Sequence, residues 1–157
     1  MFLNHTVDAI YASHVLEHIS YRNELTPTLN EWVRVLKPGG VAMIAVPDLS
    51  VLSKLFLNET LSLQQRFEVT RMIFGGQVDN YDYHKAGFDY KLLASILNSN
   101  GFCRVRKVND FKLFRDTSTL RHLGVPISLN VIARVCTKQP VSILELEDHE
   151  GNILKIN

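Results

Sequence analysis

Two histidines and a carboxylate lie close together near the start of the sequence, and their side chains could transfer protons. His14, Glu17 and His18 lie within one short stretch, and His84 follows in a polar segment further along. Imidazole changes its charge near neutral pH, so each histidine could accept a proton from a reacting hydroxyl or amine. We therefore predict His14, His18 and His84 as candidate catalytic bases. Polar lining of a pocket is the alternative role for His14 and His18, and an ordinary loop position is the alternative for His84.

The spacing of His14, Glu17 and His18 could also place three metal ligands on one face of a helix. The simpler interpretation is that these residues only begin the helical turn after a strand. We adopt this interpretation, so the sequence analysis predicts no metal site.

The elements that must position these residues alternate between strand and helix. Residues 7–12 and 41–46 are mostly apolar and are expected to be strands, the second covered on both faces. Residues 28–37 form one apolar helical face, which is carried by Leu29, Trp32, Val33 and Leu36. Pro38 and the following two glycines are expected to end this helix in a turn.

The rest of the chain continues the alternation. The segments are one or two amphipathic helices at 49–74, a polar loop at 77–87, a helix at 88–100, a strand at 102–108, a long connection at 110–126 and a strand at 128–136. This order predicts an α/β fold with a parallel sheet that ends in an antiparallel pair.

Three stretches in this order resemble a known family. Residues 8–18, 31–48 and 84–102 resemble the second, C-terminal half of a class I S-adenosylmethionine-dependent methyltransferase, of the kind called methyltransferase type 11. The resemblance implies a partial Rossmann-like sheet with strands placed 4-5-7-6 and the final strand antiparallel. It implies a partial methyltransferase domain at 1–137, with a helical insert or lid at 49–76. A C-terminal tail at 138–157, with a possible hairpin, would follow.

The resemblance also implies roles for residues at the carboxyl ends of the strands, where ligands bind in open α/β sheets. Ser13, His14, Val15 and Leu16 match positions that line the pocket for the cofactor, S-adenosylmethionine. The substrate side would hold His18 together with Pro47, Asp48 and Tyr83. The family chemistry is transfer of a methyl group from a sulfonium, with a base where the acceptor must lose a proton.

The family's glycine-rich turn and ribose-binding acidic residue, which precede these strands, have no match here, since no G-x-G occurs in the sequence. We therefore expect a truncated enzyme of this family, acting on a small molecule or glycan precursor. The alternative is a non-catalytic, methyltransferase-like remnant that serves as a binding or oligomerisation module.

Chain topology predicts that one face of the sheet needs a cover. Right-handed crossovers would place both connecting helices on the same face, although residues 41–46 are apolar on both faces. The open strand at 7–12 would also offer an edge for pairing. The helical insert could fold back over the bare face, a homodimer or a separate N-terminal half could cover it, or the chain could be a piece of a longer enzyme.

Composition and sequence pattern limit the partners and the location that can be expected for this chain. The 157 residues carry a net charge of +1, which favours neither nucleic acid nor a membrane surface as a partner. The sequence contains neither a signal-peptide pattern nor an apolar run of the ~18 residues that a membrane span needs. Cys103 and Cys136 are then expected to be reduced thiols, and the cytoplasm is the expected location.

Overall fold

A four-stranded mixed sheet forms the centre of the computed structural model, which describes residues 2–137, 146–147 and 153–154. The strands are β1 (Val7–Ser13), β2 (Leu36–Pro47), β3 (Phe102–Val108) and β6 (Ser128–Val135), and their order across the sheet is β1-β2-β6-β3. β1 and β2 are parallel, whereas β6 runs antiparallel to both of its neighbours. This arrangement confirms the predicted order 4-5-7-6 with its antiparallel final strand.

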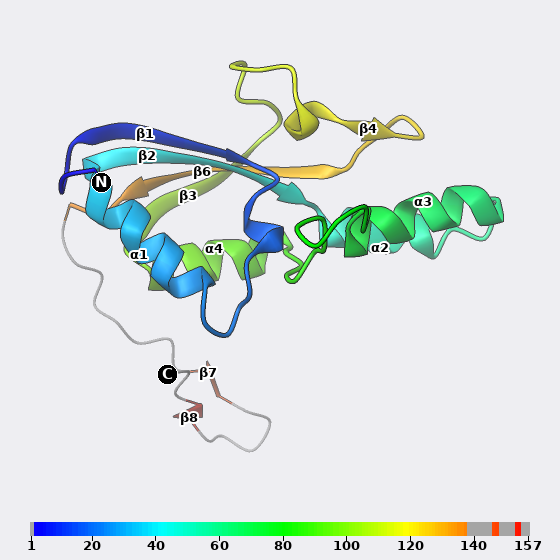
Figure 1. The fold of residues 1–157 in the computed structure, drawn as a ribbon, viewed down its shortest axis with the longest axis horizontal. Coiled ribbons are helices and arrows are strands. Elements are labelled where there is room, and N and C mark those ends of the chain that lie inside the picture. Colours follow the sequence, from blue (N-terminus) through cyan, green and yellow to red (C-terminus); the bar gives the residue numbers. More distant parts are fainter. Residues whose placement is uncertain (1, 138–145, 148–152, 155–157) are drawn as a thin grey trace.

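Two helices cover one face of the sheet. Helix α1 (Leu25–Val35) and helix α4 (Tyr90–Ser99) lie on the same side, as the crossover argument predicted (Figure 1). Cross-strand neighbours on this face, such as Ala12, Ile44 and Val131, are buried against them. Burying each large apolar side chain here contributes about 1.5–3 kcal/mol, so this face holds the main core.

The opposite face is partly covered by a segment that was not among the expected covers. The connection between β3 and β6 crosses its far end, where buried Asn130 donates hydrogen bonds to the carbonyls of Asn109 (3.0 Å) and Ser118 (2.9 Å). The Tyr11 ring meets the rings of Phe111 and Phe114 edge to face, with centroids 5.5 and 5.0 Å apart. This connection therefore shields part of the second face without help from the helical insert.

The helical insert points away from the sheet. Helices α2 (Leu49–Phe56) and α3 (Leu63–Phe74) pack on each other and extend beyond the carboxyl ends of β1 and β2 (Figure 1). Their small core consists of Leu52, Val69 and Ile127. The possibility that the insert folds back over the bare face is thus wrong. Its few apolar residues form a separate core with Ile127, at the end of the sheet.

Several boundaries differ from the predicted ones. Helix α1 begins at Leu25 rather than at residue 28, and β2 begins at Leu36 rather than at residue 41. Leu36 pairs with Val7 across the sheet, and the next pair is Ala9 with Val41. The register shift between these pairs accommodates the extra residues around Gly39, whose φ is +74°. Pairing with β1 thus extends the strand through residues that favour a turn when considered alone.

The long connection also contains local structure. It includes the short helix η2 (Thr117–Thr119) and a hairpin of β4 (Arg121–His122) and β5 (Val125–Pro126). In the tail, β7 (Leu146–Glu147) and β8 (Ile153–Leu154) pair antiparallel, while the rest of the segment predicted as a tail, 138–145, 148–152 and 155–157, lies outside the described residues. Among the described helices, none is long and apolar enough to span a membrane.

Cys103 and Cys136 are joined by a disulfide, with their Cα atoms 5.4 Å apart. The prediction of two reduced thiols is therefore wrong. The residues are 33 positions apart in sequence, but the pairing of β3 with β6 places them side by side.

Candidate functional site

The candidate site lies beyond the carboxyl ends of β1 and β2. After Ser13 the chain turns sharply at His14, whose φ is +54° and whose amide donates to the carbonyl of Ala45 at 2.8 Å. The short helix η1 (Leu16–His18) follows and presents Glu17 and His18. The strand ends thus position the residues that the sequence singled out.

These residues line a cleft of about 240 Å³. The cleft contains all three predicted bases and Pro47, together with residues from α3 and from the loops before α4 and β6. Its lining residues are His14, Glu17, His18, Pro47, Met72, Asp82, His84, Thr117, Leu120 and Ile127.

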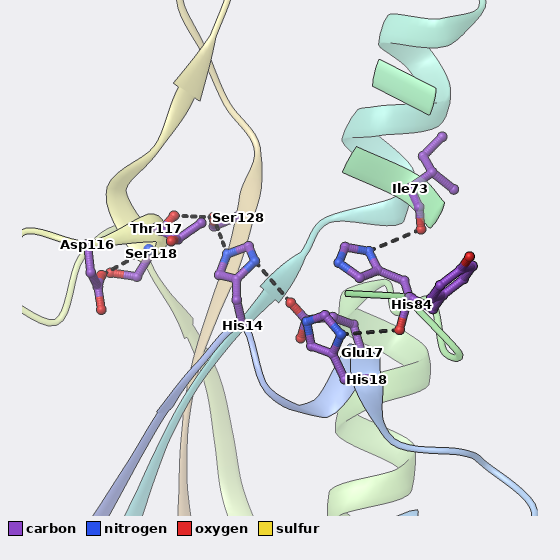
Figure 2. A network of polar contacts seen from close by, with 10 residues as sticks. His14, Glu17, His18, Ile73, His84, Asp116, Thr117, Ser118 and Ser128 are labelled. Carbon is purple, nitrogen blue, oxygen red and sulfur yellow. Dashed lines mark hydrogen bonds and ion pairs between the residues drawn. The ribbon is translucent and has the colours of Figure 1, made fainter. Parts of the chain in front are cut away.

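The loop after α3 brings His84 to the other histidines. The His84 amide donates to the Phe74 carbonyl at 3.1 Å, which fixes the residue against the end of α3. The next two amides, of Lys85 and Ala86, donate to the Glu17 carbonyl at 2.7 and 3.0 Å. As a result the rings of His18 and His84 meet edge to face, with centroids 4.9 Å apart (Figure 2).

Backbone carbonyls fix which nitrogen of these two rings carries a proton. Nδ1 of His18 lies 3.1 Å from the Tyr83 carbonyl oxygen, and Nδ1 of His84 lies 3.2 Å from that of Ile73 (Figure 2). A carbonyl can only accept, so Nδ1 must donate in both cases, and the neutral ring keeps its lone pair on Nε2. Burial lowers the pKa of His84 below its ordinary value, which favours this neutral form.

His14 has a different set of partners. The Ser128 hydroxyl donates to the Thr117 carbonyl at 2.8 Å, so it can only accept from His14 Nε2, which lies 2.9 Å away. His14 Nδ1 then faces the Glu17 carboxylate, 3.0 Å from Oε1. Both nitrogens of His14 are occupied, which makes it less available as a base than His84.

Glu17 is the least expected member of the site. Its side chain is fully buried, and neither carboxylate oxygen has a hydrogen-bond partner among the described residues. The contact with His14 has the distance of an ion pair without the angles of a hydrogen bond. Because a buried carboxylate is costly without partners, Glu17 has an unmet need for a cation or a donor.

Two predicted substrate-binding residues have other contacts. Asp48 does not line the cleft: its Oδ1 accepts from the Val51 amide to cap α2, and its Oδ2 accepts from Lys107 Nζ at 3.0 Å. Both oxygens are thus used within the fold. The Tyr83 side chain is about half exposed and does not line the cleft either. Only its backbone carbonyl contacts a residue of the site, since it orients the ring of His18.

The four residues predicted to contact the cofactor follow one another along the outer edge of the described sheet, since β1 pairs only with β2 there. The Ser13 hydroxyl is buried and has no hydrogen-bond partner among the described residues, and Val15 is 42% exposed. Leu16 is fully buried in the core, so only its backbone is free for a ligand. An unpartnered hydroxyl beside an exposed apolar residue fits one wall of a cofactor pocket.

Sequence reasoning missed the residues that distant segments bring to the cleft. Asp82 and Thr117 line the cleft from two loops, and Ser128 at the start of β6 contacts His14 behind it. None of the three was predicted as a site residue. Glu17 did carry a signal, its place between two histidines, but only in the metal-binding pattern that was not adopted.

Comparisons with known proteins agree with this architecture. The family model described as "Methyltransferase domain" matches residues 1–44. No curated protein matches the chain by sequence.

Solved structures match most of the chain at low identity. The CurJ carbon methyltransferase is 17% identical with a TM-score of 0.53, and the match covers 86% of this chain and 31% of that one. A protein from Bordetella parapertussis, titled as a possible exported protein, is 14% identical with a TM-score of 0.55, covering 86% and 41%. A SAM-dependent methyltransferase from Archaeoglobus fulgidus is 18% identical with a TM-score of 0.52, covering 85% and 61%.

The chain therefore has the Rossmann-like fold of class I methyltransferases and carries the methyltransferase-domain signature over its first strand, first helix and part of β2. The fold and this local match agree with the resemblance; S-adenosylmethionine as the cofactor and methyl transfer as the activity are what the resemblance implies. The chain spans less than two thirds of the length of each of these three structures.

Proposed function

We propose that this chain forms the acceptor-binding part and one wall of the cofactor site of an S-adenosylmethionine-dependent methyltransferase. The observation that supports this most is the cleft at the carboxyl ends of β1 and β2. It gathers unprotonated imidazole nitrogens next to the edge at which the predicted cofactor-binding residues lie. Methyl transfer needs this combination of two adjoining sites.

The cofactor, when bound, supplies a methyl group on a sulfonium that is ready for in-line transfer. The residues of this chain would hold the acceptor in the cleft and take up its proton. His84 suits this task best, because its Nδ1–H is committed to the Ile73 carbonyl and burial favours an unprotonated Nε2. His18 has the same orientation and would bind the acceptor beside it.

The remaining wall of the cofactor pocket requires polypeptide packed against the open edge of β1. A glycine-rich turn and an acidic residue for the ribose are what the family uses there. We propose that these come from a segment joined to this chain, from a separate N-terminal half, or from a second copy in a homodimer.

The size of the cleft favours a small acceptor. At about 240 Å³ it is smaller than the ~300–1,000 Å³ of typical ligand pockets. We propose a small molecule, or the small reactive end of a larger one such as a glycan precursor. Its nucleophile would be a hydroxyl or an amine, since these groups must lose a proton for which the histidines are arranged.

One observation favours a second function, that of a non-catalytic binding or oligomerisation module. Three large apolar side chains of the helical insert are strongly exposed: Leu57 at 73%, Leu63 at 86% and Phe67 at 63%. Exposed apolar patches of this kind often mark protein contacts. The two functions are not exclusive, but only the first requires cofactor binding.

The direct test is calorimetric titration of the chain with S-adenosylhomocysteine. We expect detectable binding by the wild type. Val15→Glu should weaken it at least about tenfold, because the new carboxylate would occupy the exposed wall against which the cofactor packs. Leu57→Glu is the matched control, since it places the same charge at an exposed apolar position of the insert. Equal weakening by both variants would contradict the proposed cofactor wall, and an absence of binding at millimolar ligand would contradict cofactor binding by this chain without the remaining wall.

A further inference from the structure

Three potential ligands converge in the cleft from two segments of the chain. One ligand atom from each of Glu17, His18 and His84 lies within 4.8 Å of the others. We propose that these three residues bind one divalent transition-metal ion, of the class of Zn²⁺, Co²⁺ or Mn²⁺. This differs from the sequence-based expectation, which considered only ligands adjacent in sequence and could not include His84.

The hydrogen bonds of the two histidines favour metal binding. Histidines that bind metals generally donate their second ring N–H to a carbonyl or carboxylate, which fixes the tautomer and the ring orientation. His18 and His84 both do this already, through Nδ1 to the carbonyls of Tyr83 and Ile73. Each ring therefore keeps its Nε2 lone pair for a ligand, and both rings line the cleft.

Glu17 provides the independent observation. Its fully buried carboxylate has two oxygens without a hydrogen-bond partner among the described residues, and it lines the same cleft. The nearby lysines have other partners, since Lys85 pairs with Glu24 and Lys107 with Asp48. The contact with His14 has poor geometry and compensates the charge of Glu17 only in part. A divalent cation between Glu17 and the two imidazoles would neutralise this charge.

The ligand set suits a site with an open position. Two histidines and one carboxylate are a common set for zinc and other first-row metals that keep a place for water or substrate. Ligands bound to Zn²⁺ at about 2.0–2.1 Å in a tetrahedron lie ~3.4 Å apart, so ligand atoms up to 4.8 Å apart must approach one another by up to ~1.4 Å. The Glu17 side chain can supply part of this movement, because neither of its carboxylate oxygens has a hydrogen-bond partner among the described residues.

The open position would face the cleft and take an oxygen of the acceptor. This consequence rests on the proposed methyltransferase function, whereas metal binding itself does not. A bound metal would lower the pKa of that oxygen, so that the proton leaves near neutral pH while His84 Nε2 acts as a ligand. Either role of His84, ligand or base, requires its unprotonated form.

The test uses the chain purified without a histidine tag and stripped of metal with a chelator. Titration with Co²⁺, followed by visible absorption, and with Zn²⁺, followed by calorimetry, should show one ion bound per chain. Glu17→Gln and His84→Gln should each weaken binding at least about 100-fold. His5→Asn is the control, since His5 is exposed and its Nδ1 contacts the Leu36 carbonyl near the opposite ends of the strands.

Thermal unfolding separates a lost ligand from a misfolded variant. Without metal, Glu17→Gln should be about as stable as the wild type, because it removes a buried charge whose ion-pair contact with His14 lacks hydrogen-bond geometry. Zn²⁺ should raise the melting temperature of the wild type more than that of Glu17→Gln. Failure of Co²⁺, Zn²⁺ and Mn²⁺ to bind at submillimolar concentration, or equal binding by wild type and both variants, would overturn the proposal. S-adenosylhomocysteine binding by the metal-free chain is measured separately, so each proposal can fail alone.

Discussion

His84 lies in surroundings that oppose a positive charge on its ring. Burial is the largest cause of its lowered pKa, and the neighbouring His18 acts in the same direction. The Glu17 carboxylate and the hydrogen bond to Ile73 only partly offset these effects. His84 is therefore the histidine best suited to work unprotonated at neutral pH, as a base or as a metal ligand.

This shift predicts a pH dependence of stability. The pKa of His84 is lower in the folded chain than its ordinary value of about 6.5 in the unfolded chain. Between these two values the unfolded chain binds more protons, so the free energy of unfolding should fall as the pH falls below about 6.5. His84→Gln should lose less stability than the wild type between about pH 7.5 and about pH 5.5.

Urea unfolding at these two pH values measures this difference. His5→Asn serves as the control and should keep the pH dependence of the wild type. Equal loss of stability in His84→Gln and the wild type would show that protonation of His84 carries no cost in the folded chain.

At the scale of elements, the turn after α3 decides whether His84 reaches the cleft. Gly75 ends this helix with a φ of +88°. A Cβ built on Gly75 would lie 2.1 Å from the Asp82 carbonyl oxygen and 3.0 Å from the His84 amide nitrogen. The turn thus requires glycine for its backbone angles and also for the close return of the loop.

Gly124 allows these two requirements to be separated. It also has a positive φ, +78°, but a Cβ there would meet nothing within 4 Å. Gly124→Ala should cost about 1–2 kcal/mol from backbone strain alone, whereas Gly75→Ala should cost about 3 kcal/mol or more, since the clash is added. Urea unfolding gives both values, and a similar cost for the two variants would mean that the loop adjusts freely around Gly75.

Local sequence patterns predicted the existence of most elements but not all of their ends. Residues 102–108 were predicted as a strand and are β3 as observed, because Phe102, Val105 and Val108 recur among basic residues in a stretch that Gly101 and Asn109 bound. The start of β2 could not be predicted in the same way. Residues 36–40 become a strand only because β1 lies beside them and supplies hydrogen-bond partners across a register shift.

At the scale of the whole molecule, the sheet is covered by helices on one face and partly by the β3–β6 connection on the other. Cross-strand neighbours on the second face, Met43 and Ile132, stay half-buried. The disulfide between Cys103 and Cys136 joins the last two strands of the sheet. Reduced thiols were expected because the sequence has no signal-peptide pattern, and the disulfide is unusual for the cytoplasmic location expected on the same ground.

The exposed apolar residues of the insert predict self-association. Light scattering should show a mass that rises with protein concentration, because Leu63 and Phe67 would be buried between chains. The double variant Leu63→Lys with Phe67→Lys should remain a monomer, while Tyr81→Lys, at a position 88% exposed, should behave as the wild type. A wild-type monomer at every concentration would argue against the role as an oligomerisation module.

The sequence by itself determined the fold class, the order of strands and the family resemblance. These depend on apolar periodicity and on crossover handedness, which are properties of consecutive residues and of chain connectivity. It also indicated His14 and His18, which follow a predicted strand, and His84, which lies in a predicted polar loop, because these positions can be recognised from consecutive residues.

Only the tertiary structure decided what those histidines can do. It placed one ring nitrogen of His18 and of His84 against a carbonyl, and one of His14 against Ser128. It buried the Glu17 carboxylate without a hydrogen-bond partner in the described part of the chain, and it made Asp48 a helix cap. It also joined the two cysteines across neighbouring strands. Each of these outcomes depends on contacts between segments far apart in sequence, and such contacts leave no local pattern from which they could be predicted.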